Sequence, residues 1–307
     1  MRRIEKFRIY YNHTIHPELL RMERKRKRLL FFLAVAVLLS PAVVFIHFYL
    51  NILVVTLVLM IPIGLYLTYL VYRIQRFKST FKPNVVNLIL DFIDDGLNFG
   101  TLKYDSKRFI EKERFIDSQL FASKAPFYQG EDFIGGKIGE LDFEMCELNV
   151  KEYSKVRNRL NYVFRGIFLH TTFNQPLKGK IIVLPREFKQ YLSRSIRTFN
   201  TLGGEEYEGS LEENFEESFM TFATKEAQVA SLLSTEMQNA IVNYRFETGK
   251  EIYISFMESE IYIAITEPKD ILEPYIFRSN VSFELVREFF EDIHMMMNIV
   301  EYFDANN

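Results

Sequence analysis

The chain has 307 residues, of which 48% are hydrophobic, and a formal net charge of −2 at pH 7. This length is enough for one or two domains with a buried core. The single cysteine, Cys146, excludes an internal disulfide framework, and no cysteine pair is available to begin a zinc site.

The charge is distributed unevenly along the chain. Residues 1–28 contain ten Lys or Arg and three Glu, a net charge of +7, whereas residues 29–72 contain no Asp, Glu, Lys or Arg. Residues 73–82 add four basic residues, so residues 83–307 carry the balance of −13. The sequence therefore predicts a basic N-terminal segment, an apolar block, a basic juxtamembrane linker and an acidic body, in that order.

The apolar block is long enough for two membrane spans, because one span needs about 20 apolar residues. We expect helices over Leu29–Phe48 and Ile52–Tyr72, with the turn at Asn51. A signal peptide has a shorter apolar core and a small-residue cleavage site, and a core helix of a soluble protein keeps a polar face. Pro41 and Pro62 favour kinks that serve packing. The absence of charge within the block argues against a pump or channel.

Both flanks of the block are basic, and the connection between the spans has no charge. The positive-inside rule then places both flanks, both termini and the acidic body in the cytoplasm. The five basic residues directly before the first span are also expected to contact anionic lipid headgroups, at about 1 kcal/mol each near the surface. They are Arg24, Lys25, Arg26, Lys27 and Arg28. A basic cluster beside a bilayer, followed by an acidic body, argues against nucleic acid as a partner.

The acidic body reads as α+β with mostly antiparallel strands and flanking helices. Helical patterns cover residues 81–97, 106–121, 225–234, 235–249 and 281–303. Strand patterns cover residues 137–150, 162–173, 178–185 and 218–224, and a hairpin covers 250–268. We expect Pro83 in a first helical turn, Ser106 and Thr235 as helix caps, and a hairpin turn at 174–179.

The stretch "YQGEDFIGGKIGELDF" raises the question of a phosphate-binding loop. Such a loop requires G-x-x-x-x-G-K-[ST] followed by a helix. Gly130 and Gly135 have the right spacing, but Gly136 stands where the lysine is needed. Lys137 comes one position late, and an alternating strand follows it. We interpret the glycines as turn positions that feed this strand.

Several carboxylates could gather a divalent cation, whose preferred ligands are oxygens. One set is Glu140, Asp142 and Glu144, which share a strand face, and the other is the adjacent pair Glu131 and Asp132. The simpler reading of the strand set is a solvated face. The run 203–217 is more acidic still, and is read as a surface loop or as a dock for a basic partner.

Three further residues are candidates for a site. Arg165 lies in a predicted central strand, so its charge needs a partner, and Glu131 or Asp132 could supply it. The result would be a structural ion pair or a ligand clamp. His170 and His294 each stand among apolar neighbours and are read as structural, because no catalytic triad order is visible.

The blocks "FYQGEDFIGGKIGELDFEMCEL" and "VFRGIFLHTTFNQPLKGKIIVLP" resemble a bacterial family, domain-of-unknown-function family 3137. The resemblance continues in "LEENFEESFMTFATKEAQVASLLSTEM", in the "IYISFMESEIYIAI" hairpin with "LEPYIF", and in the basic head with two spans. It implies a two-pass protein of the bacterial inner membrane and a membrane-anchored helical partner of the LemA type. It transfers no activity, cofactor or catalytic residue.

The sequence favours a membrane-anchored cytoplasmic interaction or scaffold module that needs no cofactor. One alternative is a membrane-associated enzyme with a carboxylate-bound divalent metal. Another is a lipid-binding domain, which would require an apolar cavity.

Overall fold

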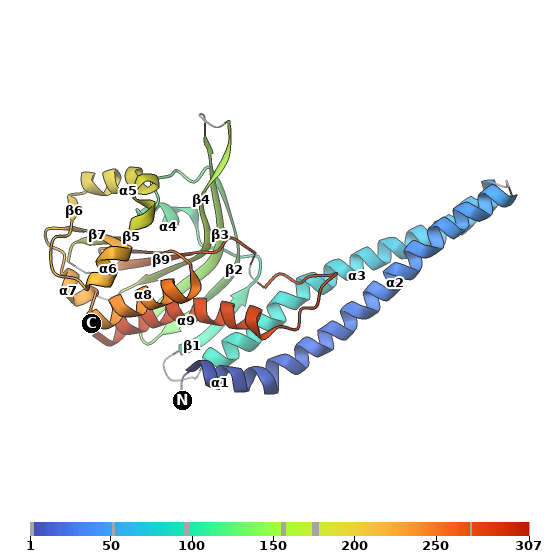
Figure 1. Cartoon of the computed structure of the whole chain (residues 1–307), viewed down its shortest axis with the longest axis horizontal. Helices are drawn as coiled ribbons and strands as arrows, with labels where there is room; N and C mark the ends of the chain where they lie inside the picture. Colours follow the sequence, from blue (N-terminus) through green and yellow to red (C-terminus); the bar gives the residue numbers. More distant parts are fainter. Residues whose placement is uncertain are drawn as a thin grey trace. The chain divides into compact units, whose positions relative to one another are not determined.

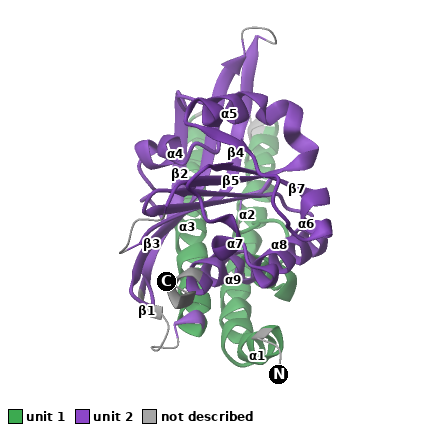
Figure 2. Cartoon of the chain, turned by 90° about the vertical axis from the view of Figure 1, so that its left-hand side faces the viewer, with its two compact units in different colours: residues 1–92, 272–289 green, residues 93–271, 290–307 purple. Residues whose placement is uncertain are grey.

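The computed structural model describes residues 3–50, 53–94, 99–154, 158–173, 178–270 and 272–306 (Figure 1). Two long apolar helices come first, and a nine-stranded antiparallel sheet with flanking helices follows within the described residues. The predicted α+β class is confirmed. The chain forms two compact units (Figure 2). Unit 1 is Met1–Phe92 with Leu272–Phe289, and unit 2 is Ile93–Ile271 with Phe290–Asn307. The predicted domain boundaries stay a prediction.

Unit 1 is built on helices that run well past the apolar block. They are α1 (Arg3–Tyr10), the π-helical turn η1 (Tyr11–Ile15), α2 (His16–Leu50) and α3 (Leu53–Ile93). Both predicted spans are helical within the described residues, whereas the predicted turn residue Asn51 lies outside them. By length and composition, α2 and α3 could each cross a membrane, and only 11% and 6% of their most apolar windows are buried.

Helix α3 continues through residues 73–82, the predicted basic juxtamembrane linker. Pro83 accordingly lies inside this helix rather than in its first turn. Phe77, Phe81, Val85 and Ile89 recur every fourth residue and are all buried. This stripe continues the helix, since its packing outweighs the one backbone hydrogen bond that the proline removes.

The sheet of unit 2 has the strand order β1-β2-β3-β4-β9-β8-β5-β7-β6. The strands are β1 (Phe99–Asp105), β2 (Phe127–Ile138), β3 (Leu141–Ser154), β4 (Arg159–Thr172), β5 (Lys180–Pro185), β6 (Gly204–Glu206), β7 (Phe219–Thr224), β8 (Ile252–Met257) and β9 (Glu260–Thr266). The predicted β8–β9 hairpin is confirmed, with Ile254 opposite Ile263. The predicted hairpin between β4 and β5 is wrong, because β4 pairs with β9 and β5 with β8, so the later hairpin separates them.

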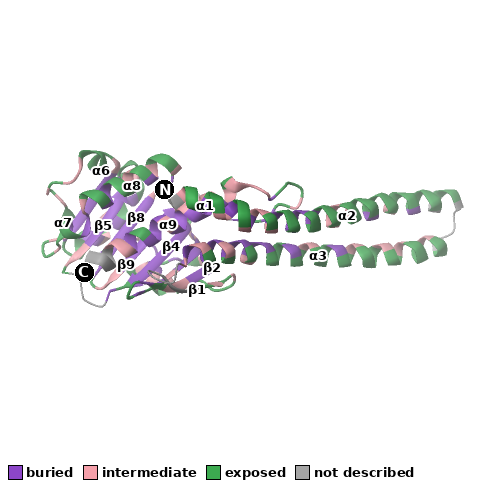
Figure 3. Ribbon diagram, turned by 90° about the horizontal axis from the view of Figure 1, so that it is seen from below, coloured by how far each residue is buried: buried purple, intermediate pink, exposed green. Residues whose placement is uncertain are grey.

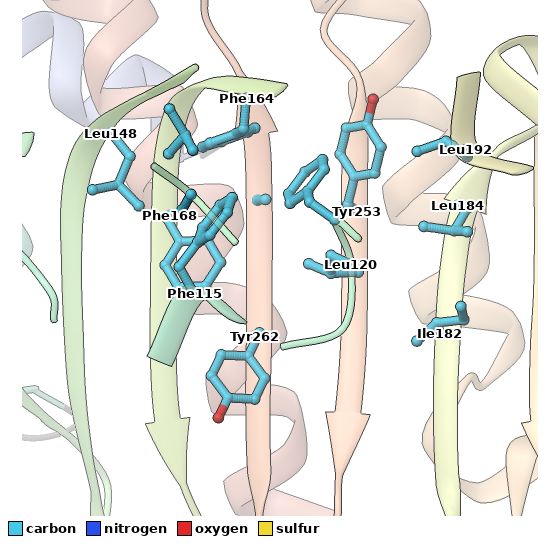
Figure 4. Packing of buried hydrophobic residues seen from close by; sticks show 14 of the residues in the cluster. Phe115, Leu120, Leu148, Phe164, Phe168, Ile182, Leu184, Leu192, Tyr253 and Tyr262 are labelled. Atoms are coloured by element: carbon cyan, nitrogen blue, oxygen red, sulfur yellow. The ribbon is translucent and has the colours of Figure 1, made fainter. Parts of the chain in front are cut away.

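One face of the sheet holds an aromatic core. Its helices are α4 (Lys112–Asp117) and α5 (Lys189–Thr201), the latter preceded by the short turn η2 (Arg186–Phe188). Phe115 of α4 stacks on Phe121 and lies 5.4 Å from Phe168 of β4, measured between ring centroids. Figure 4 shows Phe115 and Leu120 among side chains from five neighbouring strands. This packing fixes α4 and the loop after it on the sheet.

The remaining helices of unit 2 are α6 (Glu213–Ser218), α7 (Val229–Leu232), α8 (Thr235–Thr248) and the part of α9 (Phe283–Asn306) from Phe290 onward. The predicted helix 225–234 is reduced to α7, and the predicted helix 106–121 is reduced to α4. The predicted acidic loop 203–217 contains β6 and α6. Helix α8 is capped by Ser234, whose hydroxyl accepts from the backbone N–H of Met237, and not by Thr235.

A buried ion network ties α9 to the end of β9. Lys250 Nζ lies 2.7 Å from both Glu267 Oε2 and Asp292 Oδ2, and Tyr244 donates its hydroxyl to Asp292. All four side chains are buried. Desolvation raises the pKa of Asp292 to about 6, although the Lys250 charge opposes the rise. Removing the lysine would leave two carboxylates in a low-dielectric site.

Candidate functional site

A groove of about 460 Å³ opens in unit 2 beside α5, and we call it the aromatic groove. Its walls are five aromatic side chains: Phe121, Tyr162, Phe188, Tyr191 and Tyr253. Tyr162 and Tyr191 are 56% and 79% exposed. Exposed aromatic rings that converge on one hollow are typical of binding sites, because they offer a large contact area at low entropic cost.

Polar contacts hold the base of the aromatic groove. Ser123 Oγ donates to Glu152 at 2.7 Å, and Arg194 of α5 lies 3.2 Å from the same carboxylate. The backbone N–H of Ala122 donates to Ser195 Oγ at 3.0 Å. Because these bonds join the loop after α4 to α5 and β3, the groove is pre-formed.

The charged side chains that line the aromatic groove are Arg194 and Glu152, and basic residues flank this lining. Lys124 follows Ser123 in the chain and Arg197 lies one helical turn after Arg194, both exposed, and Lys151 Nζ lies 4.7 Å from the centre of the Tyr162 ring. Helix α5 contains three basic residues and no acidic one, within a body of net charge −13. Flanking positive charges of this kind favour an acidic ligand or partner.

The sequence prediction missed this groove because it assigned no structure to residues 186–201. A usable signal was present. Phe188, Leu192, Ile196 and Phe199 recur at helical spacing, and Leu192 and Phe199 are buried. The pattern could not predict which segments form the groove wall opposite α5, because β3 and the loop after α4 are distant from α5 in sequence.

The carboxylates Glu131, Asp132 and Glu147 lie together on β2 and β3, and we call them the acidic trio. One ligand oxygen from each lies within 4.8 Å of the others, and Glu131 stands directly opposite Glu147 in the ladder. A bulge in β2 gives Asp132 a φ of 60°, and Tyr104 donates its hydroxyl to this carboxylate. Carboxylate oxygens at this separation suit Ca²⁺ or Mg²⁺. Sequence reasoning found two of the three members; the third needs the β2–β3 register.

The sequence suggested Glu131 or Asp132 as the partner of Arg165, but Arg165 pairs with neither. Its guanidinium lies 2.6 Å from Asp270 Oδ1, and its central carbon lies 5.9 Å from the Tyr162 ring centre. The predicted need for an acidic partner is right, but the partner comes from the segment after β9. Because β9 pairs with β4, that segment begins beside Arg165.

The predicted cation face of Glu140, Asp142 and Glu144 is not assembled. Asp142 lies 3.6 Å from Lys137, and Glu144 lies 3.4 Å from Arg108. These carboxylates are used in cross-strand and loop ion pairs of the exposed kind, which contribute little to stability. A metal site in this region would therefore use the acidic trio instead.

Three of the four glycines of the "YQGEDFIGGKIGELDF" stretch, Gly130, Gly135 and Gly136, are strand residues, so the predicted turn is wrong at these three positions. A Cβ on Gly130 would lie 2.6 Å from Phe109 Cβ, and one on Gly135 would lie 2.8 Å from the Phe133 ring. The glycines are needed for this close packing on β2. The turn comes later, at Gly139, which has a φ of 58°. A shallow groove of about 500 Å³ passes here, and Arg108 stacks on Phe133 at 3.9 Å.

His170 is not isolated among apolar groups, as the sequence had suggested it would be. His170 Nε2 lies 3.4 Å from Glu260 Oε1, and Arg114 and Tyr262 also bind that carboxylate. Burial and the Arg114 charge lower the pKa of His170, so the imidazole is neutral at pH 7. His294 contacts the ring of Phe290 edge-on. Among the described residues, His170 interacts with Glu260, Arg114 and Tyr262, which is the pattern of a structural network.

In unit 1, four of the five predicted headgroup residues are exposed: Arg24, Lys25, Lys27 and Arg28. Arg26 departs from the prediction because it is buried. Its Nε lies 2.8 Å from Glu23 Oε2, and it also donates to the carbonyl of Ile276. The hydrogen bond from Arg26 lowers the pKa of Glu23, although burial opposes the shift. Contact of the exposed four with lipid stays a prediction.

The fold and these sites define an α+β protein with two helices apolar enough to enter a membrane. Residues 162–305 match the model of the family described as "Protein of unknown function (DUF3137)". The predicted resemblance to this family is confirmed over residues 162–305. The glycine-rich block 127–148, which also carried the resemblance, precedes the match. No activity comes with the family.

Comparison with other proteins adds no function. No curated protein matches the chain. Among solved structures, the crystal structure of the mycobacterial trehalose monomycolate transport factor A, TtfA, matches with 6% identity. The match covers 66% of this chain and 88% of that one, with a TM-score of 0.29. A likeness at this level carries no argument about fold or function.

Proposed function

We propose that the protein is a membrane-anchored interaction module, in which α2 and α3 hold the sheet domain at the cytoplasmic face of the membrane. The sheet domain binds an acidic segment of a partner protein in the aromatic groove. A membrane-anchored helical protein of the LemA type, which the family resemblance implies, is one such partner.

The exposure of apolar side chains on α2 and α3 is the observation that carries the anchor. Leu38, Phe45 and Leu65 are 71%, 74% and 69% exposed, and Figure 3 shows both helices exposed along most of their length. In water, each fully exposed side chain of this size lacks the stabilisation of about 1.5–3 kcal/mol that its burial would give. A hydrocarbon surrounding removes that penalty, so both helices fit a bilayer.

Charge supports the orientation. Exposed basic residues stand before the apolar part of α2 and after that of α3, including Arg28, Arg73 and Arg76. The positive-inside rule then places both ends of the helix pair in the cytoplasm. The aromatic groove supports the interaction, because two of its five rings, Tyr162 and Tyr191, are exposed and the basic residues that flank it complement an acidic segment.

Site-specific photocrosslinking in native membranes tests the interaction. A benzoylphenylalanine placed at Tyr191 should yield a discrete crosslinked protein, and the same group at Phe246, which is 90% exposed on α8, should not. The partner should be lost in an Arg194→Glu, Arg197→Glu variant. Equal crosslinking at both positions, or an unaltered product in the charge-reversed variant, would refute the groove as the binding site.

Cysteine labelling tests the orientation. Cys146 is 1% exposed and burial raises the pKa of its thiol, so it is nearly unreactive. An added Ser193→Cys on the exposed side of α5 therefore acts as the reporter. A membrane-impermeant maleimide should label it only after the cells are opened. Labelling of intact cells would overturn the cytoplasmic placement.

The acidic trio supports a second candidate function, that of a metal-dependent enzyme. This function requires Ca²⁺ or Mg²⁺ held by Glu131, Asp132 and Glu147. If interaction is the sole function, metal analysis of the purified full chain should find fewer than one Ca²⁺ or Mg²⁺ ion per chain. One ion per chain that is lost in Glu147→Gln would establish the metal site instead.

A further inference from the structure

The loop of residues 272–282 in unit 1 is attached directly to α2. Arg26 donates from Nη1 to the backbone carbonyl of Ile276, while its Nε and Nη2 bind Glu23. Arg26 and Glu23 are 5% and 6% exposed. The buried guanidinium makes charge-assisted hydrogen bonds, which are stronger than hydrogen bonds between neutral groups. The middle of the loop is therefore held at the level of Arg26.

Further contacts close the loop on itself and on α3. The side chain of Asn280, which is 5% exposed, accepts from the N–H of Tyr275 at 2.7 Å and donates to its carbonyl at 2.9 Å. Lys82 of α3 lies 3.7 Å from Glu273 at the start of the loop. A loop held at its start, middle and end keeps a fixed tip.

The fixed tip exposes aromatic side chains. Phe277 is 82% exposed and Tyr275 is 48% exposed, and Arg278 beside them is exposed as well. Burying a phenylalanine stabilises a protein by about 1.5–3 kcal/mol. A rigid loop that holds one outward forgoes that stabilisation in water.

The tip lies at the edge of the apolar block. Arg26 precedes Leu29 by three residues, which is about 4.5 Å along a helix at 1.5 Å per residue. Just beyond Leu29, Phe31 and Phe32 are 64% and 45% exposed. The exposed Lys25, Lys27 and Arg28 stand at the same level of α2. Aromatic and basic side chains at the end of an apolar span are characteristic of the membrane interface.

We propose that the 272–282 loop is a membrane-contact element, whose Phe277 enters the boundary between the headgroups and acyl chains of an anionic bilayer. Arg278 and the exposed basic residues of α2 then bind anionic headgroups. This inference rests on the proposed anchoring of α2 and α3, because that anchoring brings the tip to the interface. Continuity with the apolar surface of α2 favours lipid over a protein as the occupant.

The sequence contains no tryptophan, so one introduced tryptophan reports on a single position. We would make Phe277→Trp, Leu38→Trp and Phe246→Trp in the full chain, each at a side chain that is at least 71% exposed. Each variant would be reconstituted in vesicles of phosphatidylcholine and phosphatidylglycerol, with bromines either near the headgroup or deep in the acyl chain. Far-UV circular dichroism would confirm that each variant is folded.

Bromines near the headgroup should quench Phe277→Trp by about half, and deep bromines should quench it less, because interfacial side chains sit about 5–10 Å into the boundary. Leu38→Trp should show the reverse depth preference, and Phe246→Trp should show no quenching. Quenching of Phe277→Trp should weaken in vesicles of phosphatidylcholine alone.

The outcomes separate the two proposals. Quenching at Leu38→Trp with none at Phe277→Trp would leave the anchor standing and overturn the loop as a lipid contact. No quenching at Leu38→Trp would overturn the anchor itself. Protection of Phe277→Trp from acrylamide without bromine quenching would show that protein covers the tip, which also contradicts the inference. Quenching that does not depend on phosphatidylglycerol would contradict the anionic preference.

Discussion

The apolar residues of α2 and of the β8–β9 hairpin are of the same kinds, yet their exposure is opposite. Leu38 and Phe45 are 71% and 74% exposed, whereas Ile254 and Ile263 are 1% and 0% exposed. A hairpin in water is stable only if its apolar face is covered. Helices in hydrocarbon have no such need, because their backbone hydrogen bonds are satisfied internally. Under the proposed anchoring of α2, the difference between the two regions is a difference of solvent.

The largest effect is expected where the sheet domain buries charge. Lys250→Ala would leave Glu267 and Asp292 together without the lysine, which should lower the free energy of unfolding by about 3–5 kcal/mol. Urea denaturation of the full chain in detergent, followed by near-UV circular dichroism, would measure it. Lys180→Ala is the matched control, because Lys180 pairs at 3.5 Å with the 74% exposed Glu258. Equal losses in both variants would show that burial does not decide the cost.

A second pair of substitutions compares the two solvents directly. Ile263→Ala removes a fully buried side chain and should cost about 2–5 kcal/mol of unfolding free energy. Leu38→Ala removes a side chain that faces outward, so no cavity forms and stability in detergent should change by less than about 1 kcal/mol. A comparable loss at both positions would mean that Leu38 packs against protein, and the lipid-facing reading of α2 would fail.

The pH dependence of stability reports on the same buried network. Because the pKa of Asp292 is raised to about 6 in the fold, the folded state binds a proton more tightly than the unfolded chain between about pH 4 and 6. The contribution of this carboxyl to stability is therefore largest below pH 4 and is lost as the pH rises through 6.

Wild type measured against Asp292→Asn isolates this contribution from the other carboxylates. The wild type should lose about 2–3 kcal/mol relative to the variant as the pH rises through this window. Asp117→Asn, at an exposed position of α4, is the control for a carboxylate outside the buried network. A flat difference for Asp292→Asn would mean that Lys250 keeps this carboxylate ionised throughout.

The smallest expected effect concerns the cap of α8. Ser234→Ala removes the hydroxyl that accepts from Met237 N–H at 3.3 Å, and should cost about 1 kcal/mol. Thr235→Ala, at the position that the sequence favoured, should cost less, because Thr235 instead donates to Glu212 at 3.1 Å on the surface. Thermal unfolding of the two variants side by side would decide the order. A larger loss at Thr235 would reverse the assignment.

Features with a local cause could be predicted from the sequence. The two long apolar helices follow from uncharged residues, the β8–β9 hairpin from strict alternation, and the α9 helix from its apolar period. Features with a non-local cause were missed or misplaced. Helix α3 continues through Pro83 because of packing, whereas α5 was missed although its apolar residues recur at helical spacing. The wrong β4–β5 hairpin arose because closeness in sequence was taken as pairing.

The candidate sites follow the same division. Glu131 and Asp132 could be singled out as a pair, but Glu147 joins them only through the β2–β3 ladder. Arg165 was expected to need an acid, but Asp270 lies 105 residues later. In the sequence, Arg26 is equivalent to four neighbouring cations. In the structure it alone is buried, where it donates a hydrogen bond to the carbonyl of Ile276.

By itself, the sequence determined the kinds of element and the surroundings they suit, because period and polarity act over a few residues. It therefore set an α+β body behind two apolar helices and indicated the family. Only the tertiary structure decided which carboxylates meet, which arginine is buried, and where aromatic side chains stay exposed. Those outcomes depend on strand order and loop attachment, which join residues far apart in the chain and are selected by the packing of the whole fold.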